Sequence, residues 1–286
     1  MSRSQIACAI GNTSSAFVRI KSSGSGSYVV TACKVLPLGR EAFEGKKQAR
    51  SMKKLLALAD EWRGEALALC FCPGAYFPLH AYFPCNAPKE ACADYCRIEA
   101  AHFLHQPEEF LHDNTAYADS AAANNLEKHL VLFYRAEPFK TLSIGFSERH
   151  PLLFCGSPLI PALHHSLAIK EKTAFLDLEN THVVLTVANK GKLEYFNCHP
   201  VKERKEAEYF AIHELQSNPL IHDCAIQAGG SLFDKTMTTL LEKETSCHVV
   251  PPGLPDGVHF SGRDSSVCRS SAAVKAICTA VMAIEN

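Results

Sequence analysis

The sequence predicts an α/β fold with mixed sheets flanked by helices, and three observations support this prediction. A meander of short apolar strands opens the chain, helices and strands alternate after it, and the same progression returns after about residue 172. Alternation of this kind is typical of layered α/β proteins. The recurrence predicts a duplicated architecture, although the two halves share no detectable sequence repeat.

The composition of the 286 residues indicates a globular chain rather than a disordered one. Hydrophobic residues make up 47 % and charged residues 21 % of the chain, which are ordinary values for a folded domain. The net charge of −1 excludes a whole-chain attraction to nucleic acid or to an anionic membrane. The one basic stretch, 46–54, is interpreted as the solvated face of a helix.

The 13 cysteines predict a reducing compartment. Their number is odd, their spacing is irregular, and several lie in apolar runs, where a free cysteine behaves as a small hydrophobic residue. The opening "MSRSQIACAIG" is too short and too polar for a signal peptide, and no apolar run is long enough to span a bilayer. We therefore expect a soluble, cytoplasmic protein.

The first half of the chain is expected to begin with three strands joined by turns. A helix, two strands closed by Pro84, a second helix, a strand pair with a turn at Glu137-Pro138 and a third helix should follow. The expected ranges, in chain order, are 6–10, 16–20, 28–36, 46–62, 65–73, 76–84, 88–105, 129–136, 141–147 and 158–170.

The second half contains the clearest β segment, residues 173–201, with a hairpin turn at Lys190-Gly191. Helices and short strands then alternate up to a terminal helix. The expected ranges are 207–216, 224–230, 232–244, 247–250 and 271–284.

Three turns rich in glycine or hydroxyl residues are candidate binding elements. They lie in "IACAIGNTSSAFVRI" (6–20), "AFLDLENTHVVLTV" (174–187) and "AIQAGGSLFDKTMTTLL" (225–241). Glycine lets backbone amides approach an anion, hydroxyls donate further hydrogen bonds, and a helix N-terminus after the turn favours negative charge. A plain hairpin turn or helix connector remains the alternative reading of each.

In this order the three turns resemble the first phosphate loop, the second phosphate loop and the adenosine motif of the actin-like ATPase superfamily. The order of the elements between them is most similar to the type IV pilus assembly protein PilM and its relative FtsA, through "ALALCFCPG", "HAYFP" and "CRIEAAHFLHQPEEF". The resemblance covers nearly the whole chain and implies a two-lobed, ribonuclease H-like duplicated fold that binds ATP with magnesium. The implied nucleotide-binding residues are Gly11, Asn12, Thr13, Ser14, Asp177, Asn180, Thr181, Gly229, Gly230 and Ser231.

Two of the three motifs depart from the family pattern. Where the family has Asp-Ile-Gly, this chain has Ala9-Ile10-Gly11, so the aspartate that helps to organise the metal and the attacking water is absent. Where the family has Asp-x-Gly, it has Asp177-Leu178-Glu179, which places a carboxylate where phosphates should lie, and like charges repel. The resemblance therefore implies a pseudo-ATPase with no catalytic residue, leaving open whether ATP and magnesium still bind.

The resemblance also implies lobe boundaries and a partner. A first lobe would span 1–170 with an inserted subdomain at about 75–165, and a second lobe would span 171–286, its terminal helix being able to pack back on the first lobe. The implied function is that of a scaffold that docks a short cytoplasmic segment of an inner-membrane pilus or secretion protein. This partner would hold the chain at the inner membrane without nucleic acid and without direct membrane insertion.

Two rival functions are weighed against the scaffold. The first is an ATP-dependent small-molecule kinase of the same superfamily, because "IGNT" (10–13) resembles the opening of type III pantothenate kinases. Ala9 counts against this kinase, since phosphoryl transfer depends on a positioned metal. The other is a metal- or redox-linked protein that uses its cysteines. A metal site could be built from Cys92, Cys96 and a histidine, but structural zinc sites have tighter cysteine pairs. We predict no metal.

Overall fold

The computed structural model describes residues 3–24, 26–118, 125–261 and 270–285. The chain divides into two compact units, each assembled from separate stretches of sequence. Unit 1 comprises 1–73, 137–165 and 253–286, and unit 2 comprises 74–136 and 166–252. The lobe boundaries expected from the sequence stay a prediction.

Unit 1 is built on a six-stranded mixed sheet in the order β14-β3-β2-β1-β4-β8. The strands are β1 (Arg3–Ile10), β2 (Ser15–Ser22), β3 (Tyr28–Leu36), β4 (Leu67–Phe71), β8 (Leu152–Gly156) and β14 (Val258–Phe260). β1, β2 and β3 form the antiparallel meander expected from the sequence, and β4 continues the sheet parallel to β1.

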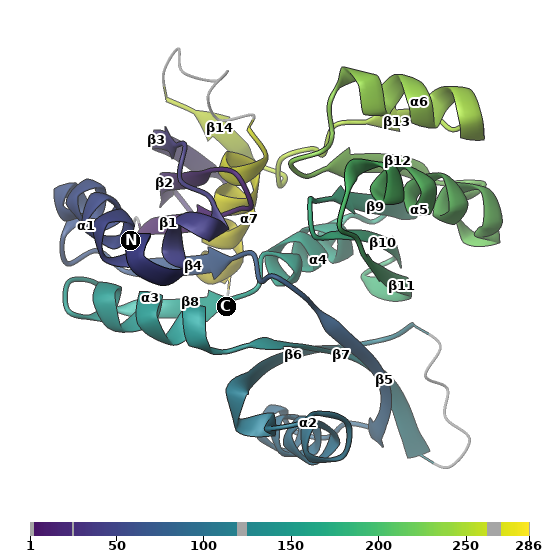
Figure 1. Ribbon diagram of the computed structural model, residues 1–286, viewed down its shortest axis with the longest axis horizontal. Helices are drawn as coiled ribbons and strands as arrows, with labels where there is room; N and C mark the ends of the chain where they lie inside the picture. Colours follow the sequence, from purple (N-terminus) through teal and green to yellow (C-terminus); the bar gives the residue numbers. More distant parts are fainter. Residues whose placement is uncertain (1–2, 25, 119–124, 262–269, 286) are drawn as a thin grey trace. The chain divides into compact units, whose positions relative to one another are not determined.

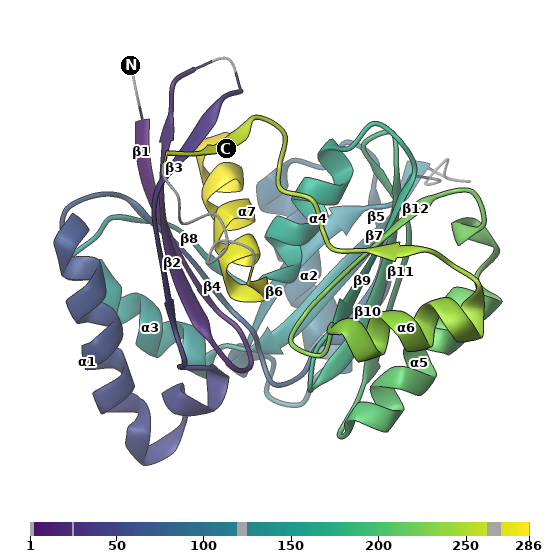
Figure 2. The same ribbon diagram turned by 90° about the horizontal axis from the view of Figure 1, so that it is seen from above.

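Helices cover both faces of this sheet (Figure 2). The terminal helix α7 (Ser271–Glu285) packs small residues such as Ala273 and Ala276 against the alanines of β1, β2 and β4. Helices α1 (Gln48–Ala59) and α3 (Glu137–Ser147) lie on the opposite face. There Phe146 of α3 packs edge-on against Phe17 of β2, with their ring centroids 6.1 Å apart. The sheet is thus buried on both sides, as in other layered α/β proteins.

The segment 141–147, expected to be a strand, is the C-terminal part of helix α3, so that prediction was wrong. Leu142, Ile144 and Phe146 alternate with smaller residues as in a strand, but the helix buries Phe139, Leu142 and Phe146 instead. This spacing of three and four residues is helical. Pro138 lies in the first helical turn, where its missing N–H costs nothing, so it does not mark a turn between strands.

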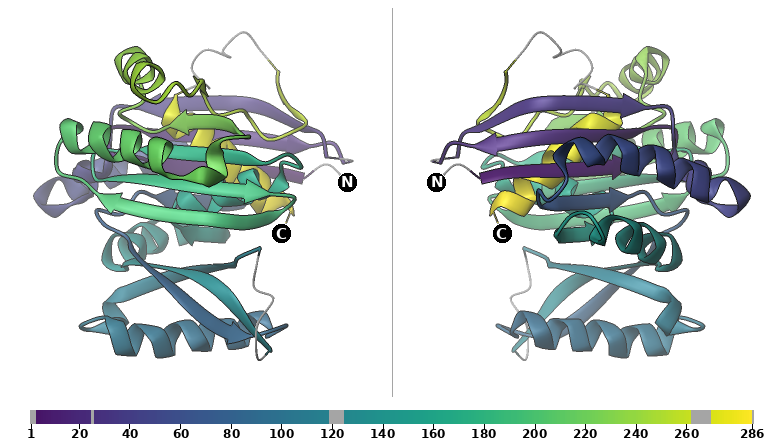
Figure 3. Two further views of the ribbon diagram at one scale, coloured as in Figure 1. Left: turned by 90° about the vertical axis from the view of Figure 1, so that its right-hand side faces the viewer. Right: turned by 90° about the vertical axis from the view of Figure 1, so that its left-hand side faces the viewer.

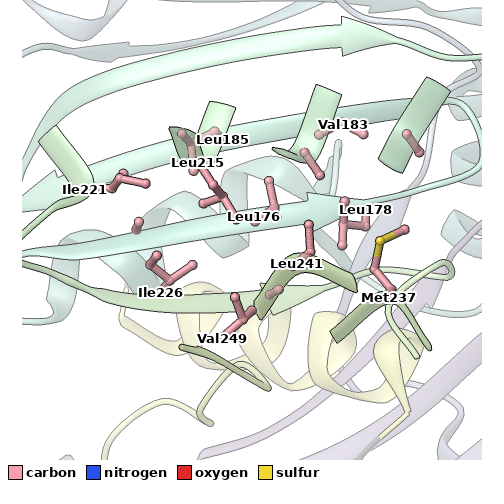
Figure 4. Packing of buried hydrophobic residues seen from close by; sticks show 14 of the residues in the cluster. Leu176, Leu178, Val183, Leu185, Leu215, Ile221, Ile226, Met237, Leu241 and Val249 are labelled. Carbon is pink, nitrogen blue, oxygen red and sulfur yellow. The ribbon is translucent and has the colours of Figure 1, made fainter. Parts of the chain in front are cut away.

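Unit 2 contains a five-stranded sheet in the order β11-β10-β9-β12-β13. Its strands are β9 (Thr173–Leu178), β10 (His182–Asn189), β11 (Lys192–Pro200), β12 (Ala225–Gly229) and β13 (Val249–Val250). Helices α5 (Arg204–Ser217) and α6 (Lys235–Thr245) cover one face (Figure 3, left). Figure 4 shows the core between them, where Leu215 and Leu241 reach toward Leu176 and Leu178 of β9.

The two large sheets share one topology. In β3-β2-β1-β4-β8 and in β11-β10-β9-β12-β13, the first two pairings are antiparallel and the last two are parallel. The duplication and the mixed α/β class expected from the sequence are therefore confirmed.

Unit 2 also contains a three-stranded antiparallel sheet, β5-β7-β6, formed by β5 (Phe77–Pro84), β6 (Phe110–Ala116) and β7 (Leu126–Arg135). Helix α2 (Lys89–Phe103) covers one face of it (Figure 1), with Cys92, Cys96 and Ala100 packed against Phe83 and Phe133. The remaining helix, α4 (Leu159–Ala168), carries the chain from unit 1 into unit 2.

The start of α6 gives a testable prediction, because Asp234 both caps the helix and binds Arg204. Its carboxylate accepts a hydrogen bond from the Met237 amide at 2.8 Å and two from the Arg204 guanidinium at 2.8 and 3.0 Å. The arginine, followed by the backbone amide, lowers the pKa of Asp234 to about 2. Since the Asp234 side chain is 49 % exposed, solvent screens the ion pair, and the helix cap should contribute more to stability than the ion pair does.

Asp234→Ala should therefore lower the free energy of unfolding by about 1–2 kcal/mol at neutral pH. A lowered carboxyl pKa stabilises the fold above the unfolded-state value, near 4, and this contribution is lost as pH falls toward 2. Urea melts at several pH values should show the difference between wild type and variant shrinking over that window. Asp234→Asn, which keeps a capping oxygen, should lose less; an equal loss would contradict the capping role.

Candidate functional site

The first candidate loop, Gly11–Ser14, closes the hairpin between β1 and β2. The Gly11 amide donates to the Ser14 carbonyl at 2.8 Å, which fixes the turn from within. Gly11 is buried, Asn12 and Ser14 are half-buried, and Thr13 is exposed. Ala9, at the position of the family aspartate, is 1 % exposed and belongs to the core beneath α7. This end of β1 therefore supplies no carboxylate for a metal.

The segment after β3 closes over this loop. The Arg40 amide donates to the Gly11 carbonyl at 2.8 Å, and the Ser15 hydroxyl donates to the Leu38 carbonyl. Between these two bonds, Gly39 approaches so closely that a Cβ atom there would lie 1.9 Å from the Asn12 carbonyl oxygen. The loop is thus held by backbone contacts that the sequence analysis did not identify.

The second candidate loop joins β9 to β10 through Glu179, Asn180 and Thr181. The Glu179 amide donates to the His182 carbonyl at 2.9 Å, and the Thr181 carbonyl accepts from the Val201 amide at 3.0 Å. The Thr181 hydroxyl lies 3.0 Å from the His182 Nδ1 atom. These bonds define a short, internally braced turn.

The third candidate turn, Gly229–Ser231, follows β12 and lies directly against the second loop. The Leu232 amide donates to the Leu178 carbonyl at 3.0 Å. Gly230 has φ of +107°, and a Cβ atom there would lie 2.2 Å from the same carbonyl oxygen. Only glycine combines that backbone conformation with so close an approach. Unit 2 therefore brings two of the three predicted motifs together, whereas Gly11–Ser14 belong to unit 1.

Glu179 connects these two turns through its side chain. Its carboxylate is buried, with the residue 1 % exposed, and accepts a hydrogen bond from the Ser231 hydroxyl at 2.6 Å. A short hydroxyl-to-carboxylate bond of this kind is stronger than a neutral one. Glu179 therefore has a structural role: its carboxylate joins the β9–β10 turn to the turn that resembles the adenosine motif.

Asp177, the other acidic residue of the second motif, lies inside the sheet. It is 1 % exposed, and its Oδ2 atom lies 3.6 Å from Nε2 of His182, which is 2 % exposed. The Tyr76 ring packs against this histidine in a T-shaped arrangement, with ring centroids 5.0 Å apart. Burial, and after it the Asp177 charge, raises the pKa of the neighbouring Cys198 to about 12. Asp177 thus has a buried histidine as a neighbour.

The sequence analysis missed His182, although a signal was present. Asp177 is paired with Val184 across the hairpin, and His182, two residues before Val184, therefore lies diagonally from Asp177 on the same face of the sheet. The alternative metal residues Cys92 and Cys96 lie in the α2 core, where burial raises the pKa of Cys96 to about 12. Within the described ranges, no group of three or more histidine, cysteine, aspartate or glutamate residues could hold a metal ion.

Comparison of the sequence with protein-family models and with curated proteins gives no match. Solved structures do match, and with the duplicated sheets they define the class of this protein, an actin-like ATPase fold. The chain is similar to one from the PilM-PilN type IV pilus biogenesis complex, with a TM-score of 0.70, 13 % identity and 99 % of each chain covered.

A second similar structure is a protein from Bacteroides thetaiotaomicron with an actin-like ATPase fold and unknown function. Its TM-score is 0.52 at 11 % identity, covering 87 % of this chain and 90 % of that one. At such identities the similarity establishes the fold, and it agrees with the resemblance to PilM drawn from the sequence. In the part of the chain that the structure describes, no helix is both long and apolar enough to cross a bilayer.

Proposed function

We propose that this chain is a PilM-like pseudo-ATPase scaffold. In this role it docks a short cytoplasmic segment of an inner-membrane pilus or secretion protein, and this partner holds it at the cytoplasmic face of the membrane. The full-length structural similarity to a chain of the PilM-PilN complex supports the scaffold.

The observation that carries the pseudo-ATPase part is the buried bond between Glu179 and Ser231. A phosphate group at the second loop would meet a carboxylate already bound by that hydroxyl, and its own negative charge would be repelled. The first loop adds to this, because Ala9 lies in the core where the family has a metal-organising aspartate. The predicted residues of the two loops then form turns and do not bind phosphate: Gly11, Asn12, Thr13 and Ser14 in the first loop, and Asn180 and Thr181 in the second.

Calorimetric titration of ATP and ADP with magnesium tests this proposal. The wild type should give no saturable heat, because the Glu179 carboxylate would repel the phosphates at the second loop. A double variant, Ala9→Asp with Glu179→Gly, restores both family residues and is the matched comparison. Saturable, magnesium-dependent binding by the wild type would contradict the pseudo-ATPase and favour a nucleotide-controlled scaffold.

The docking part is tested in the same way with synthetic peptides. They should cover the cytoplasmic segments of the inner-membrane pilus and secretion proteins of the same cell. One of them should bind saturably, and added ATP should leave its affinity unchanged. If none binds, the scaffold role is wrong whatever the nucleotide result.

A further inference from the structure

Helix α1 concentrates positive charge on one side of unit 1. Residues 45–59 contain five cations and no acid, within a chain of 29 cations and 30 acids. Without those five, the rest of the chain would carry 24 cations against 30 acids, a net charge of −6. The charge of −1 that excluded a whole-chain field therefore conceals a strongly uneven distribution.

The packing of α1 directs its exposed cations toward solvent. Met52, Leu55 and Ala59 are buried under the helix, which prevents α1 from rotating about its axis. The opposite side is exposed and carries four cations that the structure describes: Lys47, Arg50, Lys53 and Lys54.

Three acids next to α1 are already paired with cations outside the helix. Glu44 pairs with Arg40, Asp60 pairs with Arg149 at 2.5 Å, and Glu61 pairs with Lys34. Among the described residues, by contrast, Lys47 just before α1 and the three exposed cations of α1 form no ion pair. Their charge is therefore not cancelled locally and is available to an external anion.

Helix α3 extends the same surface. It lies beside α1, since a Cβ atom on Gly145 would meet the Met52 side chain at 2.2 Å. Lys140 and Ile144 are one helical turn apart on α3 and both are exposed, Ile144 by 65 %. We call the set of Lys47, Arg50, Lys53, Lys54, Lys140 and Ile144 the basic face.

We propose that the basic face lies directly against an anionic lipid bilayer. Its cations are exposed on two neighbouring helices rather than gathered in one pocket, so an extended, continuously charged surface suits them better than a small anion. Clusters of four to eight Lys and Arg on a helix are typical of binding to anionic lipids. The apolar side of α1 is already used in the core, so the contact is electrostatic, with Ile144 as the one aliphatic side chain able to enter the headgroup region.

This inference does not depend on the nucleotide or docking proposals. It adds a direct membrane contact to a chain that would otherwise reach the membrane only through a partner.

The test is sedimentation of the full chain with vesicles of phosphatidylcholine, with or without phosphatidylglycerol. Wild type should bind only the anionic vesicles, and added salt should release it. A triple variant should weaken binding on the order of 100-fold or more; it combines Arg50→Glu, Lys53→Glu and Lys54→Glu. Each Lys or Arg near an anionic surface raises the binding affinity about fivefold. Ile144→Ser should weaken binding severalfold and leave the salt dependence unchanged.

The matched control has the same charge change in unit 2, through Lys202→Glu, Lys205→Glu and Lys235→Glu, which are all exposed. It should bind like wild type, and circular dichroism should show both triple variants folded. If the α1 variant does not fold, the salt series on the wild type still decides, since salt-insensitive binding would overturn the proposal. So would equal losses in both triple variants, or binding to polyglutamate or duplex DNA without binding to anionic vesicles.

Discussion

Gly230→Ala is expected to lower the free energy of unfolding by about 3 kcal/mol, among the largest effects of a single methyl group in this protein. Two costs combine: a side chain at φ of +107° is strained, and its Cβ atom would overlap the Leu178 carbonyl at 2.2 Å. Relief of that overlap would separate the turn from β9 and break the bond from the Leu232 amide to the same carbonyl. Urea denaturation measures the loss.

Gly229→Ala is the matched control, one residue away in the same turn. Its backbone is outside the left-handed region, and its Cβ atom would meet only Pro252 and Phe175 side-chain atoms, at 3.3 Å and beyond. It should cost less than about 1 kcal/mol. If the two glycines cost the same, the close approach at Leu178 is not what holds the turn.

The fold could be predicted because its signals are local. The apolar run of β10, a glycine with positive φ in the hairpin that follows it, and the buried apolar runs of β1 and β4 each specify an element within a few residues. The repeated progression of such elements was enough to predict the duplication that the two sheets confirm.

Elements whose identity depends on distant partners were harder to predict. The alternation in 141–147 was compatible with a strand, and only packing of Phe139 and Phe146 against the six-stranded sheet selects a helix. Strands β6, β8 and β14 were not predicted. β8 lies at the edge of its sheet and pairs with β4, whose residues are 85 or 86 positions earlier in the chain, and nothing within its own five residues specifies that pairing.

The same distinction applies to the candidate site. The glycine-rich turns stand out in the sequence, and two of them do meet in unit 2. The bond from Ser231 to Glu179 joins residues 52 apart, so the sequence indicated a carboxylate in the loop without indicating its partner. The nucleotide role of the predicted loop residues stays a prediction, which the calorimetric titration addresses.

Gly39 is the clearest residue that the sequence analysis missed, and Gly39→Ala should also cost about 3 kcal/mol. Its Cβ atom would lie 1.9, 2.4 and 2.6 Å from backbone atoms of Asn12 and Thr13, which cannot move without opening the β1–β2 hairpin. The bond from the Arg40 amide to the Gly11 carbonyl should be lost with it. Hydrogen exchange should therefore show faster exchange at the Arg40 amide, together with a lower urea midpoint.

Gly145→Ala is the control that distinguishes overlap with backbone atoms from overlap with a flexible side chain. In the same unit, its Cβ atom would lie 2.2 Å from the end of the Met52 side chain, which can turn away, and alanine favours the helix by about 1 kcal/mol. This variant should be near neutral despite a similar nominal clash. A large loss at Gly39 beside none at Gly145 would show that the first loop is fixed by a glycine pressed on its backbone, as the comparison of Gly230 with Gly229 would show for the turns in unit 2. The loops would then be held in shape without any nucleotide, as a pseudo-ATPase scaffold requires.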